Sequence, residues 1–441
     1  MKRRTLIQGM ALTSIMPFSA SAFEQVNDLG KSILGKSPEL VAQDESYWSK
    51  VSSYYDKTKH IVNLEHGYWG KMARPVQDYY LSAIKMVNAQ NSFYARKDYE
   101  TALQFSVKRV ADALGVNEDE IVLTRNATES IHNLIRQYRN LQPNDAVLFA
   151  DLDYPSYKTI MSWLKQERKV KLVKLDLPSR SDQASLLKRY NQAFDDNPNL
   201  KMMLLTHVSN QHGMILPVRE IIEEARKRGI DVICDNAQSW GLLDYKMPDL
   251  NIDFAGFNLH KWIGAPVGVG ALYIRKSQLH KIAPYPGERD DKNTDINKRV
   301  HLATSNFAAM LSVPSALDFH QTIGEKNKQA RLNYLRDLWV KEVESLEHIE
   351  ILGGTDEQSR TGMGSFRIIG QTSIDDAKSL QQTIERDFGI FTVVREGLSS
   401  GGCVRVTPQV FTTIDQIKLL VRALKKINRN LKASVQTNLS A

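Results

Sequence analysis

The chain has 441 residues, of which 42% are hydrophobic and 24% charged, and its formal net charge is +8. This length and ordinary composition indicate a globular protein that buries a large core and divides into two domains. The basic residues are scattered among acids, which indicates a soluble basic surface rather than a nucleic-acid-binding stripe, and two cysteines do not make a disulfide scaffold.

The N-terminus has the layout of a bacterial signal peptide. Arg3 and Arg4 precede an apolar stretch, residues 10–18, and the small residues Ala20-Ser-Ala22 follow it. The twin arginine predicts export to the periplasm by the twin-arginine translocase, with residues 1–22 as the signal peptide. A basic, frayed start on a cytosolic protein is the alternative. Residues 23–60 are then an N-terminal arm.

The next part of the chain, residues 61–305, predicts a large α/β domain. Short apolar runs alternate with amphipathic helical patterns such as residues 130–139 and 218–228. This alternation predicts a mainly parallel sheet covered by helices on both faces, with ligands bound beyond the carboxyl ends of its strands. The expected strands are residues 121–123, 146–150, 170–173, 202–205, 230–234, 252–257 and 270–274.

Three of these strands lead into polar motifs. Thr124-Arg-Asn-Ala-Thr-Glu129 opens a helix and predicts a phosphate cradle, although a simple helix cap has the same residues. Tyr154 follows the next strand, where its ring could cover a bound cofactor or pack on the surface. Asn210 or His207, after a third strand, could donate a hydrogen bond to that cofactor.

The most informative pair is Asp235 and Lys261, each at the end of a predicted strand. Pyridoxal 5′-phosphate (PLP) chemistry requires these two groups. The lysine amine forms a Schiff base with the cofactor aldehyde, and the carboxylate holds the pyridine nitrogen protonated. A lone lysine beside a strand is usually a solvated charge, but the pair in this context predicts a PLP site.

Residues 306–441 predict a smaller α+β domain. A long helical stretch is expected over residues 308–346, with a helix over 374–388 and a last helix over 414–427. Short strands are expected at residues 365–369, 391–394 and 404–406. Residues 429–441 are polar and are expected to be frayed.

In this order the motifs resemble those of class V aminotransferases, a family of PLP fold type I that includes cysteine desulfurases and isopenicillin N epimerase. The resemblance runs from Asn63-Leu-Glu-His-Gly-Tyr68 to Arg405-Val-Thr-Pro408. Asn258-Leu-His-Lys-Trp262, followed by Ala265-Pro266, is most similar to the isopenicillin N epimerase-like branch. The resemblance implies the PLP-dependent transferase fold type I, with a large mainly parallel α/β domain and a smaller α+β C-terminal domain.

The resemblance also implies roles for single residues. Lys261 would carry the Schiff base and shuttle the proton, Asp235 would pair with the pyridine nitrogen, and Arg405 would bind the substrate α-carboxylate. Thr304 would reach the phosphate of a second subunit, which implies a homodimer with shared sites. The remaining implied cofactor ligands are Ala127, Thr128, Asn258 and His260 at the phosphate, Gln238 and Asn210 at the ring hydroxyl, and Tyr154 stacked on the ring. No metal ligand is expected.

Departures from the family pattern narrow the reaction. The loop from Arg395 to Gly402 lacks the mobile cysteine of desulfurases, and Tyr154 stands where many relatives have histidine. The chain is expected to act at the α-carbon of an amino acid or of a peptide-borne amino acid, as an aminotransferase. Modification of a siderophore peptide in the periplasm is one specific case. Epimerisation and β-elimination remain open, whereas a catalytically idle binding protein has no need to keep Lys261, Asp235 and Arg405.

Overall fold

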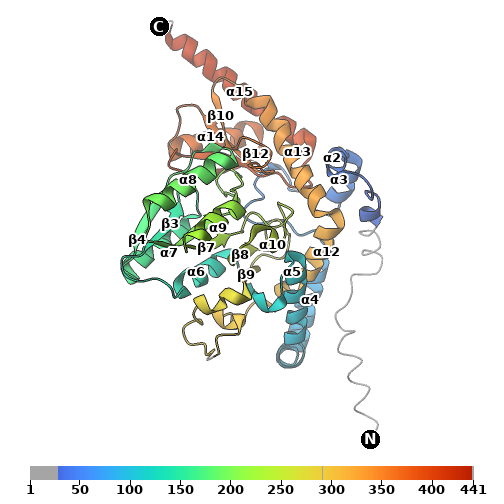
Figure 1. The fold of residues 1–441 in the computed structure, drawn as a ribbon. Coiled ribbons are helices and arrows are strands. Elements are labelled where there is room, and N and C mark those ends of the chain that lie inside the picture. Colours follow the sequence, from blue (N-terminus) through green and yellow to red (C-terminus); the bar gives the residue numbers. More distant parts are fainter. Residues whose placement is uncertain (1–27, 291, 440–441) are drawn as a thin grey trace.

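The computed structural model describes residues 28–290 and 292–439 (Figure 1). The predicted signal peptide, residues 1–22, lies outside the described residues. The arm contains two short helices, α2 (Pro38–Gln43) and α3 (Glu45–Ser52), and α2 packs against α13 (Glu325–Val343) of the C-terminal part.

A seven-stranded sheet forms the centre of the molecule, in the order β2-β9-β8-β7-β6-β3-β4. Neighbouring strands from β8 to β4 are parallel, and β9 runs antiparallel to both of its neighbours. Its mainly parallel character is as predicted, and every expected strand is present. The strands are β2 (Ile121–Thr124), β3 (Ala146–Ala150), β4 (Lys171–Leu175), β6 (Leu200–Thr206), β7 (Asp231–Asp235), β8 (Phe254–Asn258) and β9 (Gly270–Ile274).

Helices cover both faces of this sheet because alternate strand residues point to opposite sides. Val147 of β3 belongs to the core under α6 and α7, whereas its neighbour Leu148 belongs to the core under α8 and α9. The helices up to the end of the sheet are α4 (Arg74–Lys97), α5 (Tyr99–Leu114), η1 (Glu118–Glu120), α6 (Ala127–Gln137), α7 (Pro155–Glu167), α8 (Gln183–Asp196), α9 (Val218–Lys227) and α10 (Met247–Leu250).

The C-terminal part begins with three helices where the sequence predicts one. Gly324 has a φ of 83°, and Ser312 precedes a helix whose second residue is proline. These positions divide the stretch into α11 (Phe307–Leu311), α12 (Val313–Ile323) and α13 (Glu325–Val343), after the short turns η2 (Lys276–Lys281) and η3 (Ile296–Arg299).

A second sheet follows in the order β13-β14-β11-β10-β5. The last helix, α15, extends to Leu439, so the expectation that the chain frays from residue 429 is wrong. Figure 1 shows α15 projecting from the C-terminal end of the molecule. The elements are β5 (Arg180–Ser181), β10 (Ile349–Gly354), β11 (Gly364–Ile368), α14 (Ile374–Phe388), β12 (Ile390–Phe391), β13 (Val393–Arg395), β14 (Cys403–Val406) and α15 (Ile414–Leu439).

Residues 62–71, which we call the strap, cross between the two parts. Its first residues form β1 (Val62–Asn63), which pairs in parallel with β12, and Leu64 accepts a hydrogen bond from the N–H of Thr407 (2.8 Å). Its last residues lie on the large part, where the N–H of Gly70 donates to the carbonyl of His260 (2.7 Å). The sequence places this segment at the start of the large domain, but its first strand belongs to the C-terminal part.

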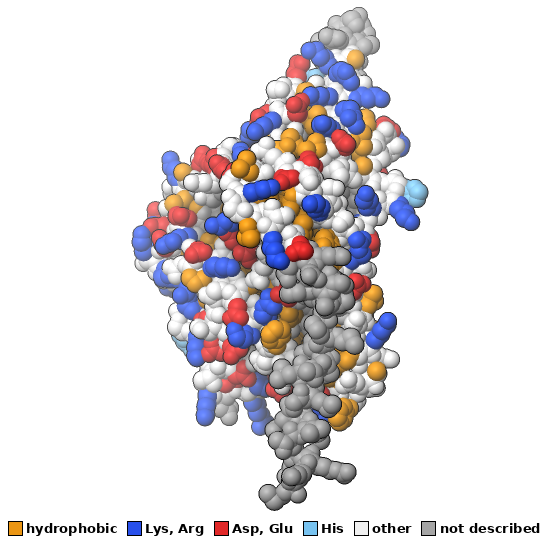
Figure 2. All heavy atoms as spheres, turned by 90° about the vertical axis from the view of Figure 1, so that its right-hand side faces the viewer, with side chains coloured by type: hydrophobic (Ala, Val, Ile, Leu, Met, Phe, Trp, Pro, Cys, Tyr) orange, Lys and Arg blue, Asp and Glu red, His pale blue; other side chains and the backbone are white. Residues whose placement is uncertain are grey.

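The surface has the mixture of basic and acidic side chains that the sequence predicts. On the face shown in Figure 2, Lys and Arg side chains are interspersed with Asp and Glu side chains. Within the described ranges, no helix combines the length and apolar character needed to cross a membrane.

Candidate active site

Lys261 lies in the turn that follows β8, with Asp235 at the end of the adjacent strand β7. Burial lowers the pKa of Lys261 to about 8, although the nearby carboxylate of Asp235 opposes this shift. Burial likewise raises the pKa of Asp235 to about 6. Neither the Lys261 Nζ nor the second carboxylate oxygen of Asp235 has a hydrogen-bond partner among the described residues; the first oxygen accepts from the N–H of Ala237 (2.9 Å). Both groups are therefore available to a ligand.

The Lys261 turn is held from three sides. The strap donates to the carbonyl of His260, and a Cβ added at Gly70 would lie only 1.9 Å from the carbonyl oxygen of Lys261. From the C-terminal part, the ammonium of Lys328 on α13 donates to the carbonyl of Trp262. The Trp262 indole is buried and donates to the side-chain oxygen of Gln238 (2.9 Å). The lysine backbone is thus fixed before any ligand binds.

The predicted phosphate cradle is present at the first turn of α6. Asn258, at the end of β8, accepts the N–H of Ala127 (2.8 Å), and Thr128 occupies the second helical position, where its N–H has no intrahelical acceptor. Gly270 allows this close approach, because a Cβ there would lie 2.6 Å from the Cα of Asn126. The Ala127 and Glu129 N–H groups are taken by side chains, so the Thr128 N–H is the one left for a phosphate at this helix N-terminus.

The other predicted cofactor ligands lie around the same strand ends. The His260 Nδ1 contacts the Val269 carbonyl (2.9 Å), and burial lowers its pKa to about 4. Gln238 also donates to the Gly67 carbonyl of the strap (2.9 Å), so both ends of its amide are engaged. Tyr154 is half-buried at the start of α7, with its ring edge-on to Tyr157 at 5.2 Å.

Three of the predicted ligand residues, Thr304, Asn210 and Arg405, have surroundings that the sequence did not predict. Thr304 is exposed in the loop before α11. Asn210 contributes its backbone carbonyl to Arg405 (2.6 Å). Arg405 itself is fully buried, and its Nη2 donates to both carboxylate oxygens of Glu65 at 2.7 and 2.9 Å.

Sequence reasoning missed Glu65, Asp153 and Arg395. Asp153 accepts from the Thr206 hydroxyl (2.6 Å), and burial raises its pKa to about 7. Arg395 lies at the end of β13, 3.8 Å from Glu65. The sequence signal for Glu65 was a charged residue directly after the strand-like residues 62–64. Its partner, Arg405, lies 340 positions away along the chain.

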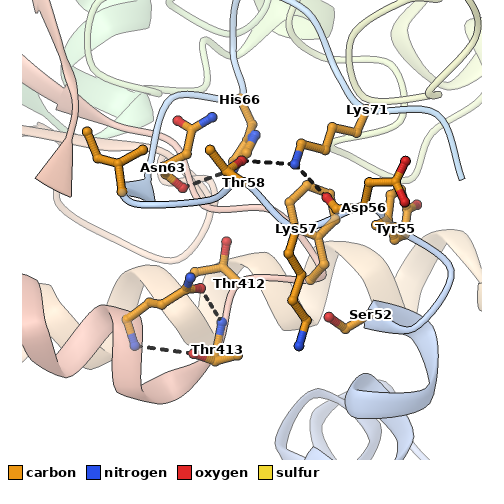
Figure 3. Close-up of a pocket in the computed structure, with 13 residues that line it drawn as sticks. Ser52, Tyr55, Asp56, Lys57, Thr58, Asn63, His66, Lys71, Thr412 and Thr413 are labelled. Carbon is orange, nitrogen blue, oxygen red and sulfur yellow. Dashed lines mark hydrogen bonds between the residues drawn. The ribbon is translucent and has the colours of Figure 1, made fainter. Parts of the chain in front are cut away.

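The strap also borders a cavity of about 150 Å³, whose lining residues are drawn in Figure 3. There the Lys71 ammonium donates to the Asp56 carbonyl (2.7 Å) and to the Thr58 hydroxyl (3.0 Å). The His66 ring contacts the Asn63 carbonyl (3.1 Å) and packs edge-on against Phe411. Asn63, His66 and Lys71 of the strap line this cavity, whereas Glu65 and Gly67 lie toward Arg405.

The residues present fit PLP. An amine without a partner faces a carboxylate with a free oxygen, and the N-terminus of α6 lies at the neighbouring strand ends. When bound, PLP supplies an electron-accepting ring that stabilises negative charge at the substrate α-carbon. Lys261 would hold the aldehyde, Asp235 the ring nitrogen, and the α6 turn with Asn258 the phosphate.

Comparisons with known proteins agree with this assignment. Residues 72–420 match the family described as Aminotransferase class-V. Isopenicillin N epimerase of Amycolatopsis lactamdurans is 24% identical over 405 residues, covering 87% of this chain and 99% of that protein. Cysteine desulfurase of Haloferax volcanii is 27% identical and covers 70% of each chain. The apo structure of cysteine desulfurase from Thermococcus onnurineus NA1 superposes with a TM-score of 0.75 at 20% identity, covering 87% of this chain and 98% of that chain.

Proposed function

The chain belongs to the aminotransferase class-V family, and on that premise we propose that it transfers the amino group of an amino acid, free or carried on a peptide. Its fold is the PLP-dependent transferase fold type I, as predicted, and it is a PLP-dependent enzyme. Relatives in the family differ in the reaction they carry out, so the proposal rests on the acid–base groups of this site.

Lys261 is the observation that carries the proposal. With a pKa of about 8, its amine is partly unprotonated near neutral pH and can remove the substrate α-proton. In transamination Lys261 would act twice, first accepting the substrate α-proton and then giving a proton back. Asp235 would hold the ring nitrogen of bound PLP, which supplies the electron-accepting ring.

The surrounding groups favour a reaction with a single base. Burial lowers the pKa of His207 and of His212 to about 3, so both imidazoles are neutral at neutral pH and cannot act as acids. Burial also raises the pKa of the Cys403 thiol to about 11, which argues against the nucleophilic cysteine of desulfurases. Both cysteines are buried and unpaired.

Epimerisation is the second candidate, because isopenicillin N epimerase matches this chain over nearly its whole length. That reaction returns the proton to the opposite face of the α-carbon and needs a second acid there. Tyr154, half-buried beside the site, is the side chain that would have to provide it.

A half-reaction separates the candidates. Purified holoenzyme is offered amino acids and short peptides in deuterated water without a keto-acid acceptor, while the cofactor absorbance is followed. Conversion of the cofactor to its pyridoxamine form supports transamination. Deuterium at the α-carbon with the cofactor form unchanged, and both enantiomers present, would contradict it in favour of epimerisation. Release of a β-substituent would indicate elimination.

We also propose periplasmic location by twin-arginine export, which rests on Arg3, Arg4 and the apolar stretch after them. Folding and cofactor loading in the cytosol before transport fit this route. Cell fractionation of the chain carrying R3K and R4K tests it, with retention in the cytosol expected and unchanged export as the contradicting result.

A further inference from the structure

Two arginines and one glutamate lie where the C-terminal sheet and the strap meet the site. Arg405 on β14 and Arg395 on β13 come from neighbouring antiparallel strands, and Glu65 comes from the strap. Both arginines lower the pKa of Lys261, which places their charges close to the reacting amine. A cationic group here is where a substrate carboxylate would bind, so the state of each guanidinium decides which of them is available.

Arg405 is already occupied. Its side chain is 0% exposed; its Nη2 donates to both oxygens of Glu65, and its Nη1 donates to the Asn210 carbonyl. Glu65 takes one Nη of Arg405 and the Asn210 carbonyl takes the other, so the pair of nitrogens that a substrate carboxylate would use is engaged within the chain. Glu65 therefore fills, from within the chain, the position that the family resemblance assigns to the substrate.

The strap holds Glu65 in this position. The Glu65 carboxylate also accepts from the Thr407 hydroxyl (3.2 Å), while the N–H of Thr407 donates to Leu64 (2.8 Å). Gly67 closes the other side, because a Cβ there would lie 2.8 Å from the Arg405 Nη2. Backbone pairing therefore fixes the strap at Glu65, and Arg405 and Thr407 together hold its carboxylate.

Arg395 is the arginine of this cluster that has no hydrogen-bonded carboxylate. Its side chain is 19% exposed, its contact with Glu65 is 3.8 Å and too long for a hydrogen bond, and its Nε is buried without a partner among the described residues. Two guanidinium groups and one carboxylate leave one uncompensated positive charge. Arg405 has both Nη atoms engaged and only its Nε without a partner, whereas Arg395 makes no hydrogen bond among the described residues, so Arg395 has more donors to offer a ligand.

We infer that Arg395, and not Arg405, receives the carboxylate of the substrate, and that Glu65 determines this choice by occupying Arg405. This inference rests on the proposed function, since it concerns the substrate of the same site. It also defines the substrate class: an amine with one carboxylate within reach of Arg395. A second carboxylate directed at Arg405 would meet the negative charge of Glu65 and be repelled.

The test uses the holoenzyme and propionate, a carboxylate without an amine that cannot react with the cofactor. Binding is measured by calorimetry and by the perturbation of the cofactor absorbance. R395M is expected to bind propionate at least tenfold more weakly than the wild type, and R395K to lose part of the affinity because ammonium lacks the guanidinium fork. R360M, which removes another half-buried arginine of the C-terminal part, is the matched control and should bind propionate normally.

A double variant decides between the two arginines. E65Q/R405M removes the ion pair together and avoids leaving one buried charge alone. We expect it to bind propionate within about threefold of the wild type, since Arg395 remains. Loss of propionate binding in the double variant, or unchanged binding in R395M, would overturn the inference.

Cofactor content separates this inference from the proposed function. Each variant is reduced with borohydride and mapped for cofactor on Lys261. Normal cofactor and propionate binding without amino transfer would overturn only the reaction type. Normal cofactor content with propionate binding that depends on Arg405 would overturn only the inference about Arg395.

Discussion

Lys261 and Asp235 should titrate as a linked pair, because the carboxylate opposes the effect of burial on the lysine. The pKa of Lys261 is lowered to about 8 by burial and would fall further without the charge of Asp235. The rate at which the apoprotein attaches PLP should rise with pH through about 8. In D235N the midpoint should move to lower pH, by about one unit. Borohydride trapping at a series of pH values measures it.

D231N is the control for that measurement. Asp231 lies at the opposite end of the same strand, where it accepts from the Tyr138 hydroxyl (2.5 Å) and the Lys281 ammonium (2.7 Å). Its loss should leave the midpoint unchanged. An equal shift in both variants would mean that the titration reports general stability and not the Lys261 environment.

The residues that local patterns placed at the site share one property: each lies at the end of a strand of the large sheet or just after it. Strand ends meet at one edge, so Asp235, Asn258 and Lys261 could be placed together from local patterns alone. Arg405 was named through the family resemblance, but its contact with Glu65 could not be predicted, because it joins positions 340 apart through a strap whose pairing is tertiary. The structure places Asp235, Asn258 and Lys261 together, whereas their roles as cofactor ligands remain predictions.

Helix α13 acts on the site through Lys328, which is buried and donates to the Trp262 carbonyl beside Lys261. Burial lowers its pKa to about 7, below the value of about 10.4 expected in the unfolded chain. Between these values the unfolded chain binds a proton that the folded chain does not. This group therefore makes the protein more stable as pH rises from about 7 toward 10.4.

K328M should lose that pH dependence. We expect its Tm to increase less than that of the wild type between pH 7 and pH 10, by at least about 2 °C. K341M is the matched control, since Lys341 is exposed on the same helix. Equal pH dependence in K328M and the wild type would indicate that Lys328 stays charged in the folded protein.

At the scale of elements, apolar runs predicted every strand of the large sheet because buried parallel strands are apolar on both faces. The long helices α4 and α5 were not predicted. Leu81, Ile84, Phe93 and Phe105 on these helices are exposed, so their apolar residues do not form one stripe that faces a core. The break at Gly324 depended on a positive φ that a glycine allows but does not require.

The exposed apolar residues of α4 and α5 concern the assembly of the whole molecule. All four lie on α4 and α5, and Phe105 also lines a cavity of α4, α5 and α11 together with Tyr79, Met86, Tyr94 and Leu311. An apolar surface of this kind suits contact with a second copy of the chain. We therefore propose a homodimer, in which the exposed Thr304 of each chain completes the phosphate site of its partner.

Mixed dimers test the shared site. K261A removes the reacting amine, and T304D places a negative charge where the partner's phosphate would bind, so each variant alone should be inactive. In a mixed dimer, one site combines the Lys261 of the T304D chain with the Thr304 of the K261A chain, and both are intact. Co-expression at equal amounts should restore about one quarter of the wild-type activity, because half of the dimers are mixed and each has one intact site. No recovery, with mixed dimers present by tagged pull-down, would mean that Thr304 serves its own chain or none. A monomer in analytical ultracentrifugation would contradict the homodimer itself.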